Sequence, residues 1–459
     1  MKKINLEKLI YKLYIFFLPF QMFSFISFPS FLSRYLFINA STIFMWIGVF
    51  LLVVKKTSLP YNYGIRSFGS LYSFMTIYSL IAAVVLFIPL GTLNGEDTFR
   101  ACIGDIIFFL IVLISIYYNW YCLSFIIDFR ELKKVIFIES IIMVLIGYIQ
   151  LGIIFGIGGL IKIYNIVGQI VQLVDTSKLS RGVVFGGTEP ASAANLFLLI
   201  VPYHLSVLLK DDNVFKQKAV HLFMIIAYFP LVAVSDSSST LIMMFITLIT
   251  FLVIKISSGR RYTVLVAVAL VIGMSVAVGY GIDGFSNNLI QFQEGTFQYK
   301  LIGKIIDTSS MSNAMRSSTI INDMKIFFSF PFTGIGNGLQ GYMYADNLPN
   351  WVLQSGEVKK LLNGSAGVID GGGAFFPMYL SGFGLIGIFV LIVFAKRYYW
   401  CYKNYGIENT EREYLFKSFL VLFLCAGWYS LGVEQNQYAA FLLSLPIIES
   451  YLENREEII

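Results

Sequence analysis

The sequence predicts an all-α polytopic membrane protein of about 12 transmembrane helices, with two larger extracytoplasmic loops that contain amphipathic helices. Hydrophobic residues make up 57% of the chain and charged residues 13%, whereas a soluble domain carries roughly 25% charged residues. The mean hydropathy is +0.75. Apolar residues fall in blocks of about 18–22, the length that crosses a bilayer. Together these observations predict a single transmembrane bundle over residues 1–459.

The expected spans are apolar blocks separated by polar breaks. They lie at 9–28, 36–54, 67–90, 103–124, 135–156, 190–209, 219–235, 238–256, 262–281, 374–395, 414–432 and 437–453. Lys and Arg collect at every second break, at Lys2, Lys3, Lys8, Lys12, Lys55, Lys56, Arg130, Lys133, Lys134, Lys210, Lys216, Lys218, Lys255, Arg260, Arg261, Lys396, Arg397, Lys403, Arg412 and Lys417. Because cytoplasmic loops are enriched in Lys and Arg, we expect a multi-pass protein of the inner (cytoplasmic) membrane with both termini in the cytoplasm.

Two long loops, at about residues 157–189 and 282–373, then fall on the extracytoplasmic side. Each contains an amphipathic pattern at helical spacing. In 160–174 the polar stripe consists of Lys162, Asn165, Gln169 and Gln172. In 318–330 the apolar stripe consists of Ile320, Ile321, Met324, Phe327 and Phe328, and away from it lie Asn322, Asp323 and Lys325. Two interpretations stay open: a packing lid over the spans, or a wall that guides a lipid-linked substrate.

Candidate site residues gather at the outer mouth of the predicted bundle. Arg181 and Glu189 flank a short run before Pro190, which suits the first turn of a helix. Glu189 is therefore either a helix cap, where the helix dipole favours negative charge, or a carboxylate directed into a cavity beside Arg181. Asp236 occupies a Ser-rich turn, and Asp370 precedes three glycines. Turn chemistry alone also accounts for Asp236.

The large loop carries a second arginine and a glycine-rich turn. Arg316 lies just before the second amphipathic pattern, and Gly334, Gly336 and Gly338 alternate after Pro331. Glycines at this spacing let backbone amides approach a ligand closely, so the turn is a candidate phosphate-binding element. An ordinary loop turn explains the same residues.

Several other classes of site are excluded. The sequence from Gly382 to Gly387 matches the dinucleotide fingerprint but lies inside a predicted span, which indicates helix packing. His204 and His221 lie near inner span ends, so no histidine is available for a metal or for catalysis on the outer face. The four cysteines do not share one side, and we expect no disulfide, no metal and no cofactor. The net charge of +6 is spread over span ends, which disfavours nucleic-acid binding.

From Arg181 to about Gly387, the chain resembles the O-antigen polymerase and ligase superfamily, membrane glycosyltransferases of the GT-C class that act in bacterial polysaccharide assembly. The resemblance rests on Arg181, on Glu189-Pro190 before a span, on the Ser-rich turn, and on the helix that begins after Arg316 and ends in Phe-Pro-Phe-Thr-Gly-Ile-Gly-Asn-Gly. The stretch 370–373 lacks the His-Asn typical of ligases, which favours a polymerase. Relatives often have a basic residue in the Ser-rich turn, where this chain has Asp236, and neither arginine has a glycine eleven residues later, as in some polymerases.

The resemblance implies a metal-independent polymerase of undecaprenyl-diphosphate-linked oligosaccharide repeat units on the extracytoplasmic face. The growing O-antigen, capsule or exopolysaccharide chain moves onto a new lipid-linked unit. Arg181, Arg316 and the three turn glycines are then candidates for binding the leaving diphosphate. Glu189 is the first candidate for the general base, followed by Asp370 and Asp236. The implied partners are membrane lipids, a chain-length regulator and a flippase.

Three alternatives stay open. The first is an O-antigen ligase-type lipid-sugar transferase, the second a polysaccharide flippase or transporter, and the third a non-catalytic assembly partner. A transporter is expected to carry polar residues deep in several spans and to lack one dominant outer loop. The middle of the predicted spans is nearly free of charge.

Overall fold

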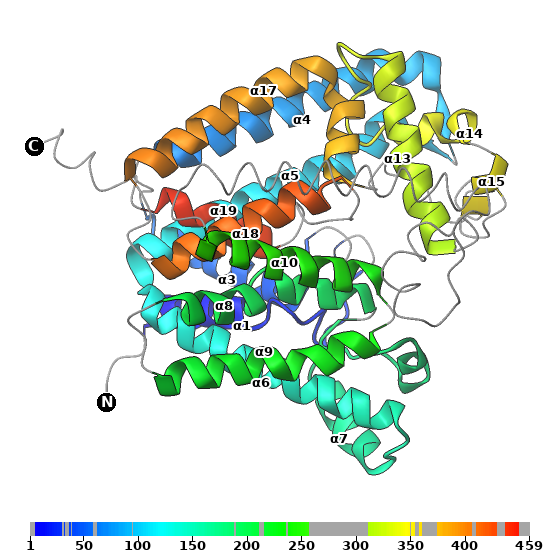
Figure 1. Ribbon diagram of the computed structural model, residues 1–459. Helices are drawn as coiled ribbons and strands as arrows, with labels where there is room; N and C mark the ends of the chain where they lie inside the picture. Colours follow the sequence, from blue (N-terminus) through cyan, green and yellow to red (C-terminus); the bar gives the residue numbers. More distant parts are fainter. Residues whose placement is uncertain are drawn as a thin grey trace, which may run out of the picture.

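The protein is mostly helical in a computed structural model (Figure 1). The structure describes residues 5–29, 32, 36, 37, 39–57, 62–93, 95–187, 190–210, 215–235, 237–256, 311–348, 350–353, 358, 359, 374–405, 410–428 and 437–448. The α-helices are α1 (Leu6–Phe16), α3 (Ala40–Val54), α4 (Tyr63–Leu90), α5 (Thr98–Tyr121), α6 (Phe129–Ile154), α7 (Gly159–Gly168), α8 (Ile200–Leu209), α9 (Phe215–Val234), α10 (Ser238–Ile256), α13 (Met311–Ser329), α14 (Tyr344–Asn347), α15 (Asn350–Leu353), α17 (Phe375–Tyr405), α18 (Thr410–Ala426) and α19 (Gln437–Ser444).

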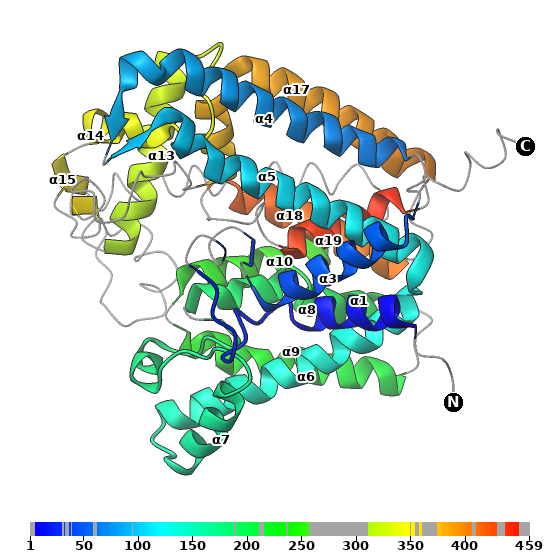
Figure 2. The ribbon, with the colours of Figure 1, turned by 180° about the vertical axis from the view of Figure 1, so that it is seen from behind.

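Shorter elements connect these helices. A π-helix covers Cys122–Ile126, and 3-10 helices cover Thr176–Arg181, Pro190–Phe197, Gln340–Met343 and Leu445–Ile447. The strands β1 (Thr92–Leu93) and β2 (Glu96–Asp97) form an antiparallel hairpin between α4 and α5. The hairpin, α7 and α13–α15 lie toward one end of the bundle in both views, which we call the α13 end (Figures 1 and 2).

Five of the described helices are long and apolar enough to cross a membrane: Tyr63–Leu90, Thr98–Ile126, Phe129–Ile154, Phe215–Val234 and Phe375–Asn404. On α4, an exposed apolar stripe at helical spacing consists of Ile77, Ile81, Val84, Val85 and Ile88. A soluble protein rarely exposes such a continuous apolar stripe, whereas lipid covers it without cost. These helices indicate a membrane-embedded protein.

The first predicted span, 9–28, is wrong in extent. α1 ends at Phe16, and Pro19 follows three residues later without the N–H that a helix interior requires. The chain beyond α1 then forms an isolated antiparallel bridge, Phe23 with Val171. The amide of Gln172 donates to the Met22 carbonyl at 2.7 Å, so the extended segment has main-chain partners outside any helix.

Two further predicted spans are divided in the structure. The span predicted at 190–209 consists of the 3-10 helix Pro190–Phe197 and the separate helix α8. Within the span predicted at 437–453, α19 passes into the 3-10 helix Leu445–Ile447 around Pro446. The span predicted at 262–281 lies outside the described residues.

The amphipathic pattern at 160–174 forms a shorter helix than predicted. α7 ends at Gly168, and three isoleucines of the predicted apolar face, Ile163 and Ile166 within α7 and Ile170 after it, have exposed fractions of 47%, 62% and 56%. Tyr164 is instead the buried residue of α7, and its hydroxyl donates to the Val174 carbonyl at 2.8 Å. The exposed isoleucines are suited to contact lipid at the membrane interface.

The prediction for the faces of the second amphipathic helix is wrong for two residues. Asn322 and Asp323, which the pattern places away from the apolar stripe, are fully buried in α13, whereas Phe328 is 72% exposed. The reason is hydrogen bonding, because the Asn322 amide group donates to the Gln340 carbonyl at 3.0 Å. A buried polar group that finds a partner avoids the cost of desolvation.

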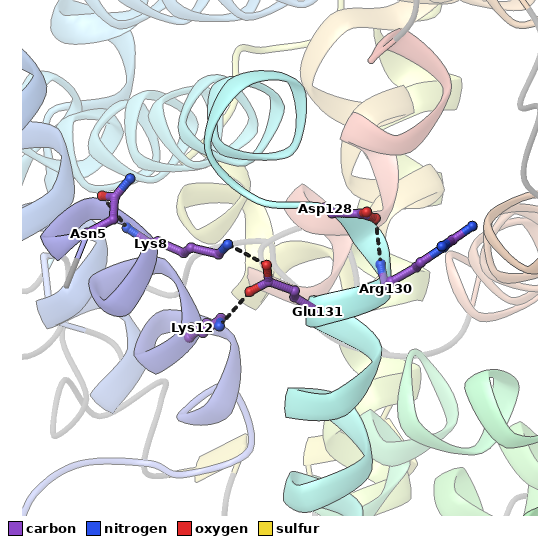
Figure 3. A network of polar contacts seen from close by, with 6 residues as sticks. All are labelled: Asn5, Lys8, Lys12, Asp128, Arg130 and Glu131. Carbon is purple, nitrogen blue, oxygen red and sulfur yellow. Dashed lines mark hydrogen bonds and ion pairs between the residues drawn. The ribbon is translucent and has the colours of Figure 1, made fainter. Parts of the chain in front are cut away.

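Ion pairs join helices where α1, α6 and α18 begin, and we call this region the basic end. Lys8 and Lys12 of α1 contact the two oxygens of the Glu131 carboxylate on α6, the second at 2.7 Å (Figure 3). Lys133 of α6 pairs with Glu411 of α18 at 2.6 Å. α6 starts at the basic end and runs to α7 at the α13 end (Figure 2).

Candidate functional site

The sequence-predicted site residues are described to different extents. Arg181 ends the 3-10 helix Thr176–Arg181, and Arg316 lies in the first half of α13. For both arginines the structure describes the backbone alone. Glu189, Asp236 and Asp370 lie outside the described residues. The structure of the site is described by the segments that carry the two arginines and by the glycine-rich turn after α13.

The segment after Arg181 is buried and fixed to α6 by one side chain. Gln150 accepts hydrogen bonds from the amides of Val184 and Phe185 at 3.0 and 2.9 Å, and it donates to the Phe185 carbonyl at 2.8 Å. Phe185 has a φ of +54°, in the left-handed region that residues with a Cβ rarely adopt. Such strain persists only where the surroundings hold it, and it concentrates at functional sites.

Three glycines form a tight turn after α13, and we call residues 331–338 the glycine turn. Gly334, Gly336 and Gly338 have φ values of +61°, +88° and +83°, which favour glycine. A Cβ on Gly334 would lie 2.5 Å from the Gly382 carbonyl carbon, and a Cβ on Gly338 would lie 2.9 Å from the Cα of Cys102. The turn thus requires glycine both for its backbone conformation and for its close approach to α17 and α5.

A kink in α17 faces the glycine turn. At Gly384 the backbone leaves helical geometry, with φ +57° and ψ −152°. In a regular helix, the Ser381 and Gly382 carbonyls would accept hydrogen bonds from the amides four residues later. Here they accept from the Ile335 and Gly336 amides at 2.9 and 2.8 Å. The glycine turn therefore supplies the donors that the kink removes.

α17 also donates hydrogen bonds to the glycine turn. The Leu385 and Ile386 amides of α17 donate to the Pro331 and Phe332 carbonyls at 2.8 and 3.2 Å. Within this segment, the Gly334 amide donates to the Phe330 carbonyl at 2.8 Å. Because the Gly334 and Gly336 amides already have protein acceptors, a phosphate bound at this turn would have to displace the Phe330 carbonyl from the first and the Gly382 carbonyl of α17 from the second.

Beneath the glycine turn lies a group of buried polar side chains, which we call the α13 polar cluster: Asp105, Asp323, Asn337, Gln340 and Ser381. The Asn337 amide group donates to Asp105 Oδ2 at 2.7 Å. Gln340 Nε2 donates to Asn337 Oδ1 and to Ser381 Oγ, each at 3.2 Å. The Ser381 hydroxyl donates to Asp323 Oδ1 at 3.2 Å. These contacts connect α5, α13, the glycine turn and α17.

Asp323 is the titratable group of this cluster with the clearest perturbation. Burial raises the pKa of its carboxyl well above the usual range, and the hydrogen bond from Ser381 opposes that rise. Asp323 Oδ2 has no hydrogen-bond partner among the described residues. A buried carboxylate with one oxygen unpartnered is costly in its charged form, so the cluster is suited to hold Asp323 in its neutral form.

The sequence analysis did not identify three buried polar residues: Gln150, Glu139 and Gln340. Gln150 and Glu139 both lie within the span predicted at 135–156, and both are fully buried. A polar residue inside an apolar block is the signal that points to them. Gln340 gave no such signal, because it lies in a loop where polar residues are ordinary.

No protein-family model matches the chain, and no curated protein matches its sequence.

Proposed function

We propose that the protein is a membrane glycosyltransferase that polymerises undecaprenyl-diphosphate-linked oligosaccharide repeat units on the extracytoplasmic face. One observation carries the proposal: each of the two arginine-bearing segments is fixed to the bundle by a buried amide side chain. Gln150 holds the segment after Arg181. Asn322 of α13, the helix that carries Arg316, donates to the Gln340 main-chain carbonyl, and the Gln340 side chain in turn donates to Ser381 of α17. An enzyme that stabilises a leaving diphosphate needs cations held in place before the reaction begins.

Arg316 occupies a defined place on a fixed helix. It precedes Asp323 by seven residues, a spacing that returns to the same side of an α-helix. Asp323 accepts a hydrogen bond from Ser381 of α17, so this side of α13 is the one against the bundle. The position of Arg316 in α13 thus supports a role at the surface between the loop and the spans.

The orientation that we propose for the protein in the membrane is inferred from the basic end. Ion pairs bring the starts of α1, α6 and α18 together with Lys8, Lys12 and Lys133. Lysines and arginines mark the cytoplasmic side of multi-pass proteins. With the basic end in the cytoplasm, α7 and α13 lie outside, where a polymerase meets lipid-linked units that have already crossed the membrane.

A polar hollow beneath α7 supports an acceptor site for sugar. Its lining includes Tyr164, Asn165, Gln169, Asp175 and Thr176. Hydroxyl, amide and carboxylate groups beside an aromatic ring match the hydrogen-bonding groups and apolar faces of an oligosaccharide. The last lining residue, Thr176, is the first residue of the 3-10 helix that ends at Arg181.

Each candidate residue has a role in this reaction. An acceptor hydroxyl attacks the anomeric carbon of the growing chain, the bond from that carbon to the diphosphate oxygen breaks, and undecaprenyl diphosphate leaves with the electron pair. Arg181 and Arg316 stabilise the charge on the diphosphate. Glu189 takes the hydroxyl proton, with Asp370 and Asp236 as the next candidates.

A second candidate function is transport of a lipid-linked saccharide. The observation that favours it is Glu139, a fully buried carboxyl inside α6, because ionisable groups within spans mark the pathways of transporters. New glycosidic bonds formed by the purified protein would support the polymerase, whereas movement of intact units across a vesicle would support the transporter.

The test uses purified protein in lipid vesicles with undecaprenyl-diphosphate-linked repeat units, and it follows polymer length. We expect Arg316→Ala and Glu189→Gln each to lower the polymerisation rate by about 10²–10³-fold, the usual effect of removing a group that stabilises the transition state. Arg130→Ala is the matched control, because Arg130 is exposed at the basic end with its side chain directed away from Glu131 (Figure 3). Native polymer ladders from both site variants would contradict the assignment.

A further inference from the structure

The glycine turn meets α4 far from the end of that helix. The Tyr78 hydroxyl of α4 donates to the Thr333 carbonyl at 2.6 Å. The Ser79 hydroxyl accepts a hydrogen bond from the Asn337 amide at 3.1 Å. At about 1.5 Å of rise per residue, Tyr78 lies about 18 Å inward from the end of α4 at Leu90. The turn therefore reaches α4 near the middle of a helix that is long and apolar enough to cross a membrane.

The part of α4 beyond this contact is apolar and exposed. From Tyr78 to Leu90 the sequence contains no charged residue, and Val85 and Ile88 have exposed fractions of 67% and 88%. Ile88 lies about 15 Å beyond Tyr78 along the helix. In a membrane protein, lipid covers a continuous apolar surface of this kind. The glycine turn therefore contacts α4 at a depth where the helix is surrounded by hydrocarbon.

α17 gives the same placement for the turn. Phe375–Asn404 is also long and apolar enough to cross a membrane, and it includes the Leu385 and Ile386 amides that donate to the turn. The side chains of both residues are exposed, as is that of Phe389 about one helical turn later. Two membrane-spanning helices therefore contact the glycine turn at positions where their neighbouring side chains face lipid.

Most main-chain polar groups of the turn have partners within the protein. The four carbonyls from Phe330 to Thr333 accept hydrogen bonds from protein donors, and the four amides from Gly334 to Asn337 donate to protein acceptors. Pro331 has no N–H that would need a partner. Non-helical backbone occurs at membrane depth only where the protein replaces water as its hydrogen-bond partner. The hydrogen bonds of the turn thus match what a position in hydrocarbon requires.

Three phenylalanines of this segment are exposed. Phe328 near the end of α13 and Phe332 in the turn have exposed fractions of 72% and 69%, and Phe330 between them is exposed as well. Large apolar side chains on an element that does not span the bilayer insert among the acyl chains and hold the element there. α13 itself crosses the direction of α4 and α17 in both views, as expected of a helix that lies along the membrane surface (Figures 1 and 2).

We propose that the glycine turn enters the hydrocarbon of the bilayer from the α13 end, and that Phe328 and Phe332 contact lipid acyl chains there. Lipid is the partner because the exposed phenylalanines continue the lipid-facing surface of α4 and α17. The turn is then a re-entrant segment of the loop predicted at 282–373. This placement does not depend on glycosyl transfer, because it rests on the packing of the turn against two spans.

The test places a nitroxide spin label at Phe332→Cys and, separately, at Phe328→Cys in the full-length protein in phosphatidylcholine vesicles. Collisions of the label with oxygen, which dissolves in hydrocarbon, are compared with its collisions with a nickel chelate, which stays in water. The four native cysteines are buried, so native protein treated with the same label gives the background. We expect the ratio of oxygen to nickel collisions at both positions to exceed that at an exposed polar position at least about tenfold, because a charged or polar solute partitions poorly into hydrocarbon.

Labels at three other positions serve as matched references. Ile77→Cys and Ile88→Cys lie on the lipid-facing stripe of α4, about 16 Å apart along the helix. We expect the label at Phe332→Cys to report a depth closer to that of Ile77 than to that of Ile88, because the next residue along the chain contacts Tyr78. Arg100→Cys is the exposed polar position, because Arg100 is an exposed charged residue at the start of α5, at the α13 end.

Two results would overturn the proposal. If the nickel collisions at Phe328→Cys and Phe332→Cys match those at Arg100→Cys, the turn lies in water. If both positions exclude oxygen and nickel alike, protein covers them, either a second copy or another part of the chain. A folding defect in one variant leaves the other position as the test. None of these readouts requires polymer formation, so their failure is separate from a failure of the proposed function.

Discussion

The two ends of the bundle are held together by different interactions. At the basic end, partly exposed side chains form ion pairs, and one carboxylate meets two lysines: Glu131 contacts Lys8 and Lys12. At the α13 end, buried main-chain groups and amide side chains form neutral hydrogen bonds, as in the pairing of Gly336 with Gly382. We therefore expect the loss of a single ion pair at the basic end to cost little stability, and the loss of a single residue at the α13 end to cost much more.

The largest expected effect is that of Gly334→Ala. A Cβ at this position meets the main chain of Gly382 at 2.5 Å, and the φ of +61° strains any residue other than glycine. We expect a loss of about 3 kcal/mol or more in the free energy of unfolding. Thermal unfolding in detergent measures it.

Gly69→Ala is the matched control for that variant. Gly69 lies within α4, and a Cβ there meets nothing within 4 Å. Alanine in a helix interior should stabilise the protein by about 0.5–1 kcal/mol. Equal unfolding temperatures for the two variants would show that the α13 end tolerates change as readily as an open helix surface.

The next effect concerns the pH dependence of stability at the α13 end. Burial raises the pKa of Asp323 above that of an unfolded aspartate, so the folded protein keeps a proton that the unfolded chain releases. The stability that this proton contributes is complete below the ordinary pKa of aspartate. It is lost as the pH rises toward and through the raised value, at about 1.4 kcal/mol for each unit of pKa difference.

Unfolding temperatures across this pH range measure that contribution, and Asp323→Asn should flatten the decline. Asp175→Asn provides a comparison, because the contribution of Asp175 to stability changes with pH in the opposite direction. The Ser177 amide lowers the pKa of Asp175, so that contribution is present above the ordinary pKa and is lost as the pH falls. A decline that persists unchanged in Asp323→Asn would show that another group causes it.

The smallest effect is expected at the basic end. Lys8→Gln leaves Glu131 its contact with Lys12 at 2.7 Å, and the side chains are about one-third exposed, at 34% and 36%. The loss should stay within about 1 kcal/mol, as for exposed ion pairs, and it should shrink in high salt. Unfolding temperatures at low and high salt measure both. A loss as large as that of Gly334→Ala would remove the contrast between the two ends.

Local sequence patterns predicted the helices better than they predicted the contacts between them. Apolar blocks located most of the described helices, and the alternating glycines marked a turn, in which the structure shows positive φ values at all three. The buried face of α13 was missed because the partner of Asp323 is Ser381, 58 residues away. Helical spacing separates polar from apolar positions, but it does not reveal that a polar position has a buried partner.

The first span and the contact between His204 and His221 show the same limit. Pro19 was a local sign that α1 ends early, but the pairing of Phe23 with Val171 has no local sign. His204 and His221 were placed near span ends, and nothing in their spacing shows that their rings meet. Their contact depends on how α6, α8 and α9 pack. The roles of Glu189, Asp236, Asp370, Arg181 and Arg316 stay predictions, because the structure does not describe their side chains.

The exchange of hydrogen bonds at the kink of α17 has a consequence for biogenesis. Around Gly384, two carbonyls and two amides of this span find their partners in the glycine turn, at residues such as Gly336. In hydrocarbon, each such group left alone costs several kcal/mol. The ribosome makes the turn before it makes α17, so the partners already exist when the span leaves the insertion machinery. We therefore expect that a chain lacking residues 311–338 inserts α17 less efficiently than the full-length chain.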